Sequence, residues 1–291
     1  MRIAQLSDLH IFDSEGVMAR DFVSKRAIGG VNLLIGRHKN HPLELAERLI
    51  ADVTSQSLDH VVVTGDVTNL SLPGEFQRAA GLLRLIGGYD ALTVIPGNHD
   101  IYTRGAEKQR RFESYFGHTL FGSDMDSEDR DFPAIKDLGE VLVIGLCSAF
   151  ASSLLTSWGR VGDEQLSRLE SQLSSGKYDN HFKVALVHHN IHQRGFLAEK
   201  TALLKDRDEV VQRLLKLKVK LLLHGHTHKA HRFEVSRDDH TMQIMGSGSS
   251  TWNSREPEHC ARYNIYTITD SLESVRTRIY DHERRRFEWL V

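Results

Sequence analysis

The sequence predicts an α/β protein, and three observations support this prediction. Short apolar runs typical of buried strands alternate with amphipathic helical segments along most of the 291 residues. The last quarter contains strand-like segments without clear helices between them. Polar side chains of metal-binding types follow the expected strands directly. With no linker or repeat in view, we expect a single domain over residues 1–291.

The elements follow from the periodicity of apolar residues. Leu45, Leu49 and Val53 recur every four residues, which gives the first helix one buried stripe. Frequent β-branched residues support the strands. Buried strands are expected at 2–7, 60–64, 91–95, 141–147, 183–187 and 219–223, and helices at about 43–57, 74–87, 106–116, 163–174 and 206–217. After His228 the expected strands cover 230–235, 241–247, 262–268, 274–281 and 285–290, and this region is predicted to be antiparallel.

Composition narrows the class of protein. The formal net charge of -2 gives no global attraction to nucleic acid or to an anionic membrane. The two cysteines lie far apart, which argues against a disulfide framework and favours a reducing compartment. The sequence contains neither an apolar stretch of the roughly 20 residues that a membrane span needs nor a pattern typical of a signal peptide. A cytoplasmic protein is therefore expected.

Five clusters of Asp, Asn and His follow five of the expected strands. They are SDLH (7–10), GDVTN (65–69), PGNHD (96–100), HHN (188–190) and GHTH (225–228). In open α/β sheets, ligands bind outside the carboxyl ends of the strands, so these clusters should converge. On an extended segment, the spacing of Asp8 and His10 would place both side chains on one side, and His226 and His228 would do the same. The sequence therefore predicts one polar site at this edge.

The residue types favour a pair of metal ions. Asp and His are suitable ligands for Mn, Fe or Zn, and one carboxylate can bridge two cations. Each cluster alone has an ordinary explanation: Asp8 with His10 as a polar loop pair, His99 as a turn residue, and His188 with His189 as one buried and one exposed imidazole. Five clusters in consistent order at strand ends favour the metal centre. No set of cysteines supports a structural zinc.

The ordered set D-x-H, GD-x-x-N, GNHD, H and GH-x-H, over residues 8–228, resembles the calcineurin-like metallophosphoesterase family. The resemblance implies a four-layer α/β/β/α sandwich and a centre of two metal ions. It also implies that His99 is not a ligand but faces the substrate phosphate and the leaving group. One metal would be held by Asp8, His10 and His228, the other by Asn98, His188 and His226, and Asp66 would bridge the two.

Two positions depart from the usual pattern of that family. Successive side chains at a strand end point to opposite faces, so only one of His188 and His189 can reach the metals. The family pattern places the ligand first and often continues with proline, where this chain has Asn190, so His188 is expected. Some members carry Asp at the position of Asn69, where it orients the catalytic histidine. An Asn side chain can accept a hydrogen bond from His99 but cannot stabilise an imidazolium as a carboxylate does.

The resemblance also implies a reaction. A hydroxide held between the metals would attack phosphorus directly, with charge on the phosphoryl oxygens met by the metals, Asn98 and His99. The style of the motifs resembles bacterial class III cyclic-nucleotide phosphodiesterases, so a small phosphodiester is the expected substrate. A pyrophosphatase or diesterase acting on a nucleotide-linked lipid and a phosphomonoesterase are alternatives. A scaffold protein without metals is disfavoured because every expected ligand residue is present. The sequence contains no basic module that would indicate specific binding of nucleic acid.

A basic amphipathic segment at about 17–41 is inserted between the first motif and the first core helix. Its basic residues Arg20, Lys25, Arg26, Arg37 and Lys39 against Asp21 give a charge of +4. A helix packed on the body, a lid over the site, and contact of residues 20–39 with anionic lipid are the alternatives. Gly29 and Gly30 argue against one straight helix. The sequence does not indicate an oligomeric state.

Overall fold

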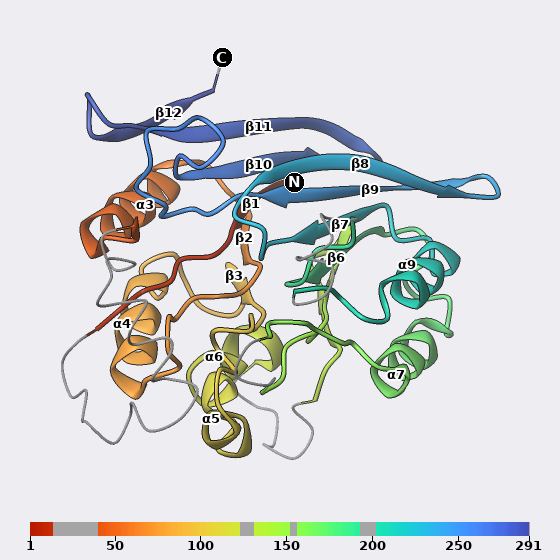
Figure 1. Cartoon of the computed structure of the whole chain (residues 1–291). Helices are drawn as coiled ribbons and strands as arrows, with labels where there is room; N and C mark the ends of the chain where they lie inside the picture. Colours follow the sequence, from red (N-terminus) through yellow and green to blue (C-terminus); the bar gives the residue numbers. More distant parts are fainter. Residues whose placement is uncertain (14–39, 123–130, 152–155, 193–201, 291) are drawn as a thin grey trace.

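The computed structural model describes residues 1–13, 40–122, 131–151, 156–192 and 202–290. Within these residues two six-stranded sheets pack against each other, and helices cover the outer face of each sheet (Figure 1). This is the four-layer α/β/β/α sandwich that the resemblance implied. The inserted segment falls almost wholly in 14–39, outside the described residues, and the single domain over 1–291 stays a prediction.

The first sheet joins the two ends of the chain. Its order is β12-β11-β10-β1-β2-β3, with β1 (Arg2–Leu6), β2 (His60–Val63), β3 (Leu92–Val94), β10 (Arg262–Ile268), β11 (Leu272–Asp281) and β12 (Arg286–Trp289). Strands β1, β2 and β3 are parallel, whereas β10 returns antiparallel to β1, with Ile3 opposite Tyr266. The C-terminal hairpins therefore complete the sheet that the N-terminus begins.

The second sheet has a parallel centre and antiparallel edges. Its order is β4-β5-β6-β7-β9-β8, with β4 (Ala134–Asp137), β5 (Val141–Gly145), β6 (Phe182–Val187), β7 (Leu221–His224), β8 (Ala230–Arg237) and β9 (His240–Ser247). Alternate residues of β5 face opposite sides: Val141 and Val143 pack between the sheets, and Leu142 and Ile144 pack under the outer helices. Both faces are thus buried, which explains why these strands have continuous apolar sequences.

The helices bury one stripe each. In α3 this stripe contains the predicted Leu45, Leu49 and Val53. On the first sheet lie α3 (Leu43–Ser55), α4 (Pro73–Leu83) and α6 (Arg111–Phe121), preceded by the short α5 (Arg104–Lys108), and on the second lie α7 (Asp163–Leu173) and α9 (Arg207–Lys216). Among the described residues no helix is both long and apolar enough to cross a membrane.

The structure differs from the expected elements in two details. The helix expected at 106–116 is divided into α5 and α6, because Arg110 adopts a left-handed conformation with φ 45°. The short polar strand β4 was not predicted. The strands after His228 pair antiparallel with one another, as expected, and β9 also pairs in parallel with β7, because the β8–β9 hairpin places its second strand beside β7.

Candidate metal centre

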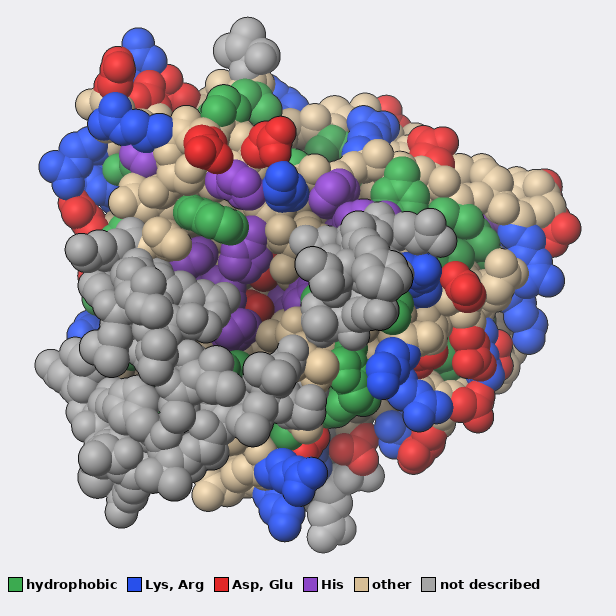
Figure 2. Space-filling view, in the orientation of Figure 1, with side chains coloured by type: hydrophobic (Ala, Val, Ile, Leu, Met, Phe, Trp, Pro, Cys, Tyr) green, Lys and Arg blue, Asp and Glu red, His purple; other side chains and the backbone are tan. Residues whose placement is uncertain are grey.

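The polar clusters lie where parallel strands end. Asp8 and His10 follow β1, Asp66 follows β2, and Asn98 and His99 follow β3 in the first sheet. His188 follows β6, and His226 and His228 follow β7 in the second. The carboxyl ends of the two sheets meet, so the clusters come together as expected. Figure 2 shows histidine side chains, with Asp or Glu side chains between them, in a recess of this face.

The loops that carry these residues are not extended. Asp8, His10, Asp66, His226 and His228 have φ values of 53°, 46°, 55°, 69° and 55°. Positive φ is uncommon for residues other than glycine, and such conformations cluster at functional sites. The reason expected for the convergence of Asp8 with His10, and of His226 with His228, is therefore wrong. Turned backbone, rather than strand alternation, directs these side chains into the site.

The first group of potential ligands consists of Asp8, His10, Asp66 and His228. The Nε2 atoms of His10 and His228 are 2.9 Å apart. His228 Nε2 lies 3.3 Å from Asp8 Oδ1, and His10 Nε2 lies 3.8 Å from Asp66 Oδ2. Asp8 is held in place because its carboxylate accepts a 2.6 Å hydrogen bond from the Ser7 hydroxyl and further ones from the backbone N–H of His226.

The second group consists of Asp66, His188 and His226, and Asn98 completes it. Asn98 Oδ1 is 3.1 Å from His188 Nε2 and 2.9 Å from His226 Nδ1. His188 Nε2 is also 3.4 Å from Asp66 Oδ2. The ring of His188 is oriented by Nδ1, which donates to the carbonyl of Thr64 at 2.8 Å. Asp66 is the only residue common to both of these carboxylate-containing groups in the described part of the chain.

This arrangement fits two cations. Ligand atoms about 2.1 Å from one cation and separated by angles of 90–110° lie about 3.0–3.4 Å apart, close to most of the spacings within both groups. The donors are imidazole nitrogens and carboxylate or amide oxygens, which suit Mn, Fe or Zn. They are also buried: Asp8, His10 and His188 have no exposed surface. Buried unpaired polar groups are costly, and two cations would compensate for this cost.

Electrostatics couples Asp66 to the imidazoles around it. Burial alone would raise the pKa of the Asp66 carboxyl, but His188 and His99 outweigh it and hold that pKa well below the usual range. Burial alone would lower the pKa of His188, whereas the attraction of Asp66 and its hydrogen bond raise it to about 9. Burial, with His41 as the next contributor, lowers the pKa of His10 well below its usual value. Asp66 is therefore an anion surrounded by buried imidazoles.

Glycines in the motifs allow this close packing. A Cβ atom at Gly97 would overlap the side chain and the backbone N of Asp66. A Cβ atom at Gly225 would overlap the Ser7 hydroxyl and approach Asp8 Oδ2 to 2.7 Å. The glycines of GNHD and GHTH are thus explained by the carboxylates that lie against them.

His99 is held beside the two groups by the backbone. Its Nδ1 donates a 2.6 Å hydrogen bond to the carbonyl of Asn69, and its ring stacks on Tyr102 with centroids 5.3 Å apart. Its centroid is 4.8 Å from that of His10, and the two rings are perpendicular. The expectation that the Asn69 side chain accepts the hydrogen bond is wrong. That amide is buried and has no hydrogen-bond partner in the described structure, because the loop presents its carbonyl instead.

His189 packs its ring on that of His226, with centroids 4.7 Å apart, but directs both ring nitrogens to other partners. Its Nδ1 hydrogen-bonds with the hydroxyl of Ser148 at 2.8 Å, and its Nε2 is 2.9 Å from the carbonyl of Ser157. Burial, and then His188, lower the pKa of His189 to about 3, so this imidazole is neutral. Of the two adjacent histidines, His188 is the one that faces Asp66.

Several residues that support the site were not predicted. The buried carboxylate of Asp100 accepts hydrogen bonds from the backbone N–H groups of Val67, Thr68 and Gly97, which ties two motif loops together. His41 lies with His10 and His228 in a third group of potential ligands. Asp100 is the last residue of the GNHD motif, so its position in the sequence could have indicated a role in the site. Nothing in the spacing of the sequence points to His41.

Comparisons with known proteins agree with this geometry. The family described as calcineurin-like phosphoesterase matches residues 1–230. A purple acid phosphatase from yellow lupin seeds superimposes with a TM-score of 0.61 and 12% identity over 99% of this chain and 52% of that one. This chain therefore spans about half the length of that phosphatase. A dimetal phosphatase from Danio rerio gives a TM-score of 0.58 and 14% identity over 100% of this chain and 98% of that one. No curated protein matches the sequence.

The fold and the site together define the class of metal-dependent phosphoesterases with a dinuclear centre. Within that class, this chain belongs to the calcineurin-like phosphoesterase family. At these low identities the two solved phosphatases support the fold alone.

Proposed function

We propose that this protein is a dinuclear metal-dependent phosphodiesterase that hydrolyses a small phosphodiester, with a cyclic nucleotide as the first candidate. The observation that carries the proposal is the position of Asp66 between two groups of ligand side chains. In this proposal Asp8, His10 and His228 hold one cation, Asn98, His188 and His226 hold the other, and Asp66 contacts both.

Bound cations would supply two effects, a lowered pKa of a water molecule and neutralisation of charge on phosphoryl oxygens. The side chains supply position. Asn98 directs its oxygen toward His188 and His226, so its amide N–H groups are directed away from them and can donate to a phosphoryl oxygen. Asp66 and Asp8 are fixed by hydrogen bonds and do not have to reorganise during the reaction.

His99 is the residue that would manage the proton of the leaving group. Because Nδ1 donates to the carbonyl of Asn69, Nε2 is the ring nitrogen that would exchange a proton with the substrate. The perpendicular contact with His10 places the ring against the first ligand group. In the imidazolium form, with protons on both ring nitrogens, His99 can pass the Nε2 proton to an alkoxide as the ester bond breaks and becomes neutral.

A diester is favoured over a monoester by the charge of the site. Among the described residues, no lysine or arginine hydrogen-bonds or forms an ion pair with the seven ligand residues. A phosphomonoester carries up to two negative charges, whereas a diester carries one and needs less neutralisation. The motif style shared with bacterial class III cyclic-nucleotide phosphodiesterases also supports this choice. We also propose that the protein acts in the cytoplasm.

A substrate panel tests the proposed function. Purified protein with added Mn²⁺ is assayed with bis-p-nitrophenyl phosphate, p-nitrophenyl phosphate, cyclic nucleotides and a nucleotide-diphospho-lipid. We expect kcat/KM for the diester to exceed that for the monoester by about tenfold or more. A preference for p-nitrophenyl phosphate would contradict the diesterase proposal. Hydrolysis of the lipid-linked substrate alone would favour the pyrophosphatase, and full metal occupancy without any turnover would favour a binding module.

A further inference from the structure

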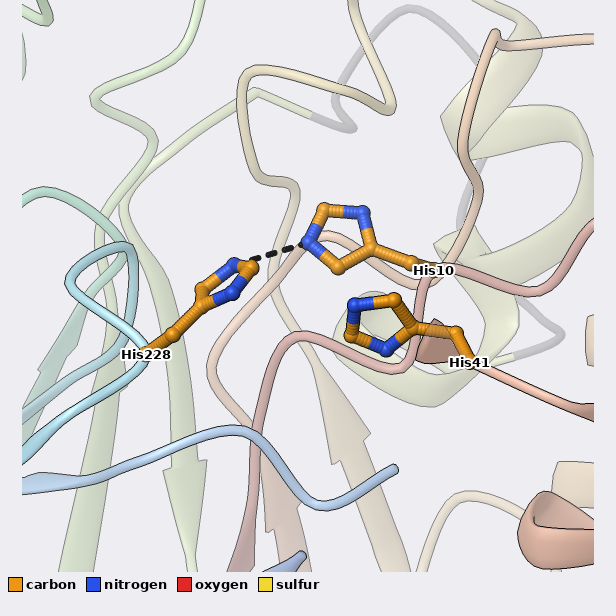
Figure 3. A group of neighbouring side chains, drawn as sticks. All are labelled: His10, His41 and His228. Carbon is orange, nitrogen blue, oxygen red and sulfur yellow. Dashed lines mark hydrogen bonds between the residues drawn. The ribbon is translucent and has the colours of Figure 1, made fainter. Parts of the chain in front are cut away.

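His41 brings a further imidazole to the site from outside the five motifs. It lies two residues before the start of α3, is 6% exposed, and belongs to the group formed with His10 and His228. The potential ligand atoms of these three residues all lie within 4.8 Å of one another. Figure 3 shows the three rings converging, with one ring nitrogen of His41 directed toward the other two rings.

The hydrogen bonds of Thr251 determine which nitrogen of His41 carries the proton. Thr251 Oγ1 is 2.8 Å from the carbonyl of Leu9, to which only the hydroxyl proton can be donated. The same oxygen is 2.9 Å from His41 Nδ1, so it accepts a hydrogen bond from an Nδ1–H group. In the neutral imidazole the lone pair is then on Nε2, the nitrogen on the side of His10 and His228.

The surrounding loop fixes His41 in this orientation. The backbone N–H of Asn253 donates to the carbonyl of Asn40 at 2.6 Å, next to the side-chain contact of Thr251. Ser249, from the same loop, donates through its hydroxyl to the carbonyl of Asp8 at 2.8 Å. The loop after β9 therefore holds both His41 and the segment that carries Asp8 and His10. Ligating histidines are commonly oriented by such a bond at the second ring nitrogen.

We propose that His41 Nε2 is a third imidazole ligand of the cation held by His10 and His228. Two ligand atoms on one cation are at most about 4.2 Å apart, which is two bonds of about 2.1 Å in line. Because the ligand atoms of the three residues lie within 4.8 Å of one another, a shift of His41 by no more than about 2 Å would bring it to the roughly 3.0–4.2 Å that ligands of one cation require. An Nε2 atom with a lone pair can bind a cation, whereas a hydrogen bond to a phosphate oxygen would need an N–H group at that position. The same pattern occurs at His188, where Nδ1 donates to a carbonyl and Nε2 faces the site.

This inference rests on the metal centre of the proposed function, but it can be tested without substrate. Metal-free protein is titrated with Mn²⁺, and free Mn²⁺ is followed by electron paramagnetic resonance. We expect wild-type protein to bind two ions, and His41→Phe to keep one site while its other site weakens by about tenfold or more. His259→Phe is the matched control. Both His41 and His259 contact Trp252, with ring centroids 6.0 and 4.7 Å from it, but His259 belongs to none of the three ligand groups.

If the folded His41→Phe protein binds both Mn²⁺ ions with wild-type affinity, the proposal is overturned. A raised KM in that case would show that His41 contacts the substrate instead. If circular dichroism shows that this variant does not fold, the ligand role is tested by NMR on wild-type protein labelled with ¹⁵N-histidine. Zn²⁺ should then move the Nε2 resonance of His41 into the metal-bound range, and an unmoved resonance would reject the ligand. If the substrate panel shows no diesterase activity, the Mn²⁺ titration and the ¹⁵N resonance of His41 can still test the ligand role.

Discussion

The backbone N–H of His99 donates a 2.8 Å hydrogen bond to Oδ1 of Asp66. The other oxygen of the same carboxylate, Oδ2, lies 3.4 Å from His188 Nε2 and 3.8 Å from His10 Nε2. One side chain therefore connects both ligand groups to the loop of the proposed catalytic histidine.

Asp66→Asn should weaken both cation sites and remove turnover. The amide keeps the size of the carboxylate but loses the negative charge that both ligand groups share. We expect each Mn²⁺ affinity to fall by about tenfold or more and kcat/KM for bis-p-nitrophenyl phosphate to fall by about a hundredfold or more. Asp90→Asn, at an exposed position, is the control. Wild-type binding of both ions by Asp66→Asn would reject the bridging role.

Gly97→Ala should disrupt the centre through Asp66. The new methyl group would overlap the Asp66 side chain and backbone, and the atoms it meets are buried and cannot move aside cheaply. We expect loss of Mn²⁺ binding, together with a free energy of unfolding lower by about 1–3 kcal/mol in urea denaturation. Gly81→Ala offers a comparison, since a Cβ atom there meets nothing within 4 Å on helix α4. That variant should bind metal normally and gain up to about 1 kcal/mol, so equal behaviour of the two variants would contradict the steric argument.

Asn69→Ala should retain activity although it borders the proposed catalytic histidine. The hydrogen bond to His99 Nδ1 comes from the backbone carbonyl of residue 69, which the substitution preserves. We expect kcat within about twofold of wild type, whereas His99→Gln should lower kcat by about a hundredfold or more. Steady-state kinetics with bis-p-nitrophenyl phosphate measures both. A loss in Asn69→Ala as large as that in His99→Gln would show that the side chain has a role of its own.

His60 should make the fold sensitive to acid at a point away from the metal centre. Burial, and then the charge of Lys136, lower the pKa of this imidazole to about 4, and its ring nitrogens lie 2.8 Å from Asp90 O and Thr93 Oγ1. An unfolded histidine has a pKa of about 6.5, so the unfolded chain binds the proton first as the pH falls. Stability from this residue is therefore present above about pH 6.5 and is lost between about pH 6.5 and 4.

The loss assigned to His60 amounts to roughly 2 kcal/mol at about pH 5. Urea unfolding at about pH 7 and pH 5 measures it when wild type is compared with His60→Gln, because other titrating groups contribute equally to both proteins. The variant should lose about 2 kcal/mol less than wild type on acidification. Equal losses in the two proteins would show that His60 does not titrate in this range.

The fold was largely predictable because its strands and helices have strong local periodicity. The stripe of Leu45, Leu49 and Val53 in α3 and the apolar run of β5 are examples. The division between α5 and α6 was not predictable, since it depends on a left-handed Arg110 that no glycine or proline marks. Strand β4 was missed because a short polar segment becomes a strand only when β5 pairs with it.

By itself, the sequence determined the α/β class, the order of the motifs at strand ends and the set of Asp, Asn and His residues that we propose as metal ligands. Those properties depend on the local spacing of residues and on residue type. Only the tertiary structure decided that Asn69 acts through its carbonyl, that turned backbone aims Asp8 and His10, and that His41 meets His10 and His228. Such contacts join segments far apart in the chain, and their geometry depends on how two sheets and a loop after β9 pack together.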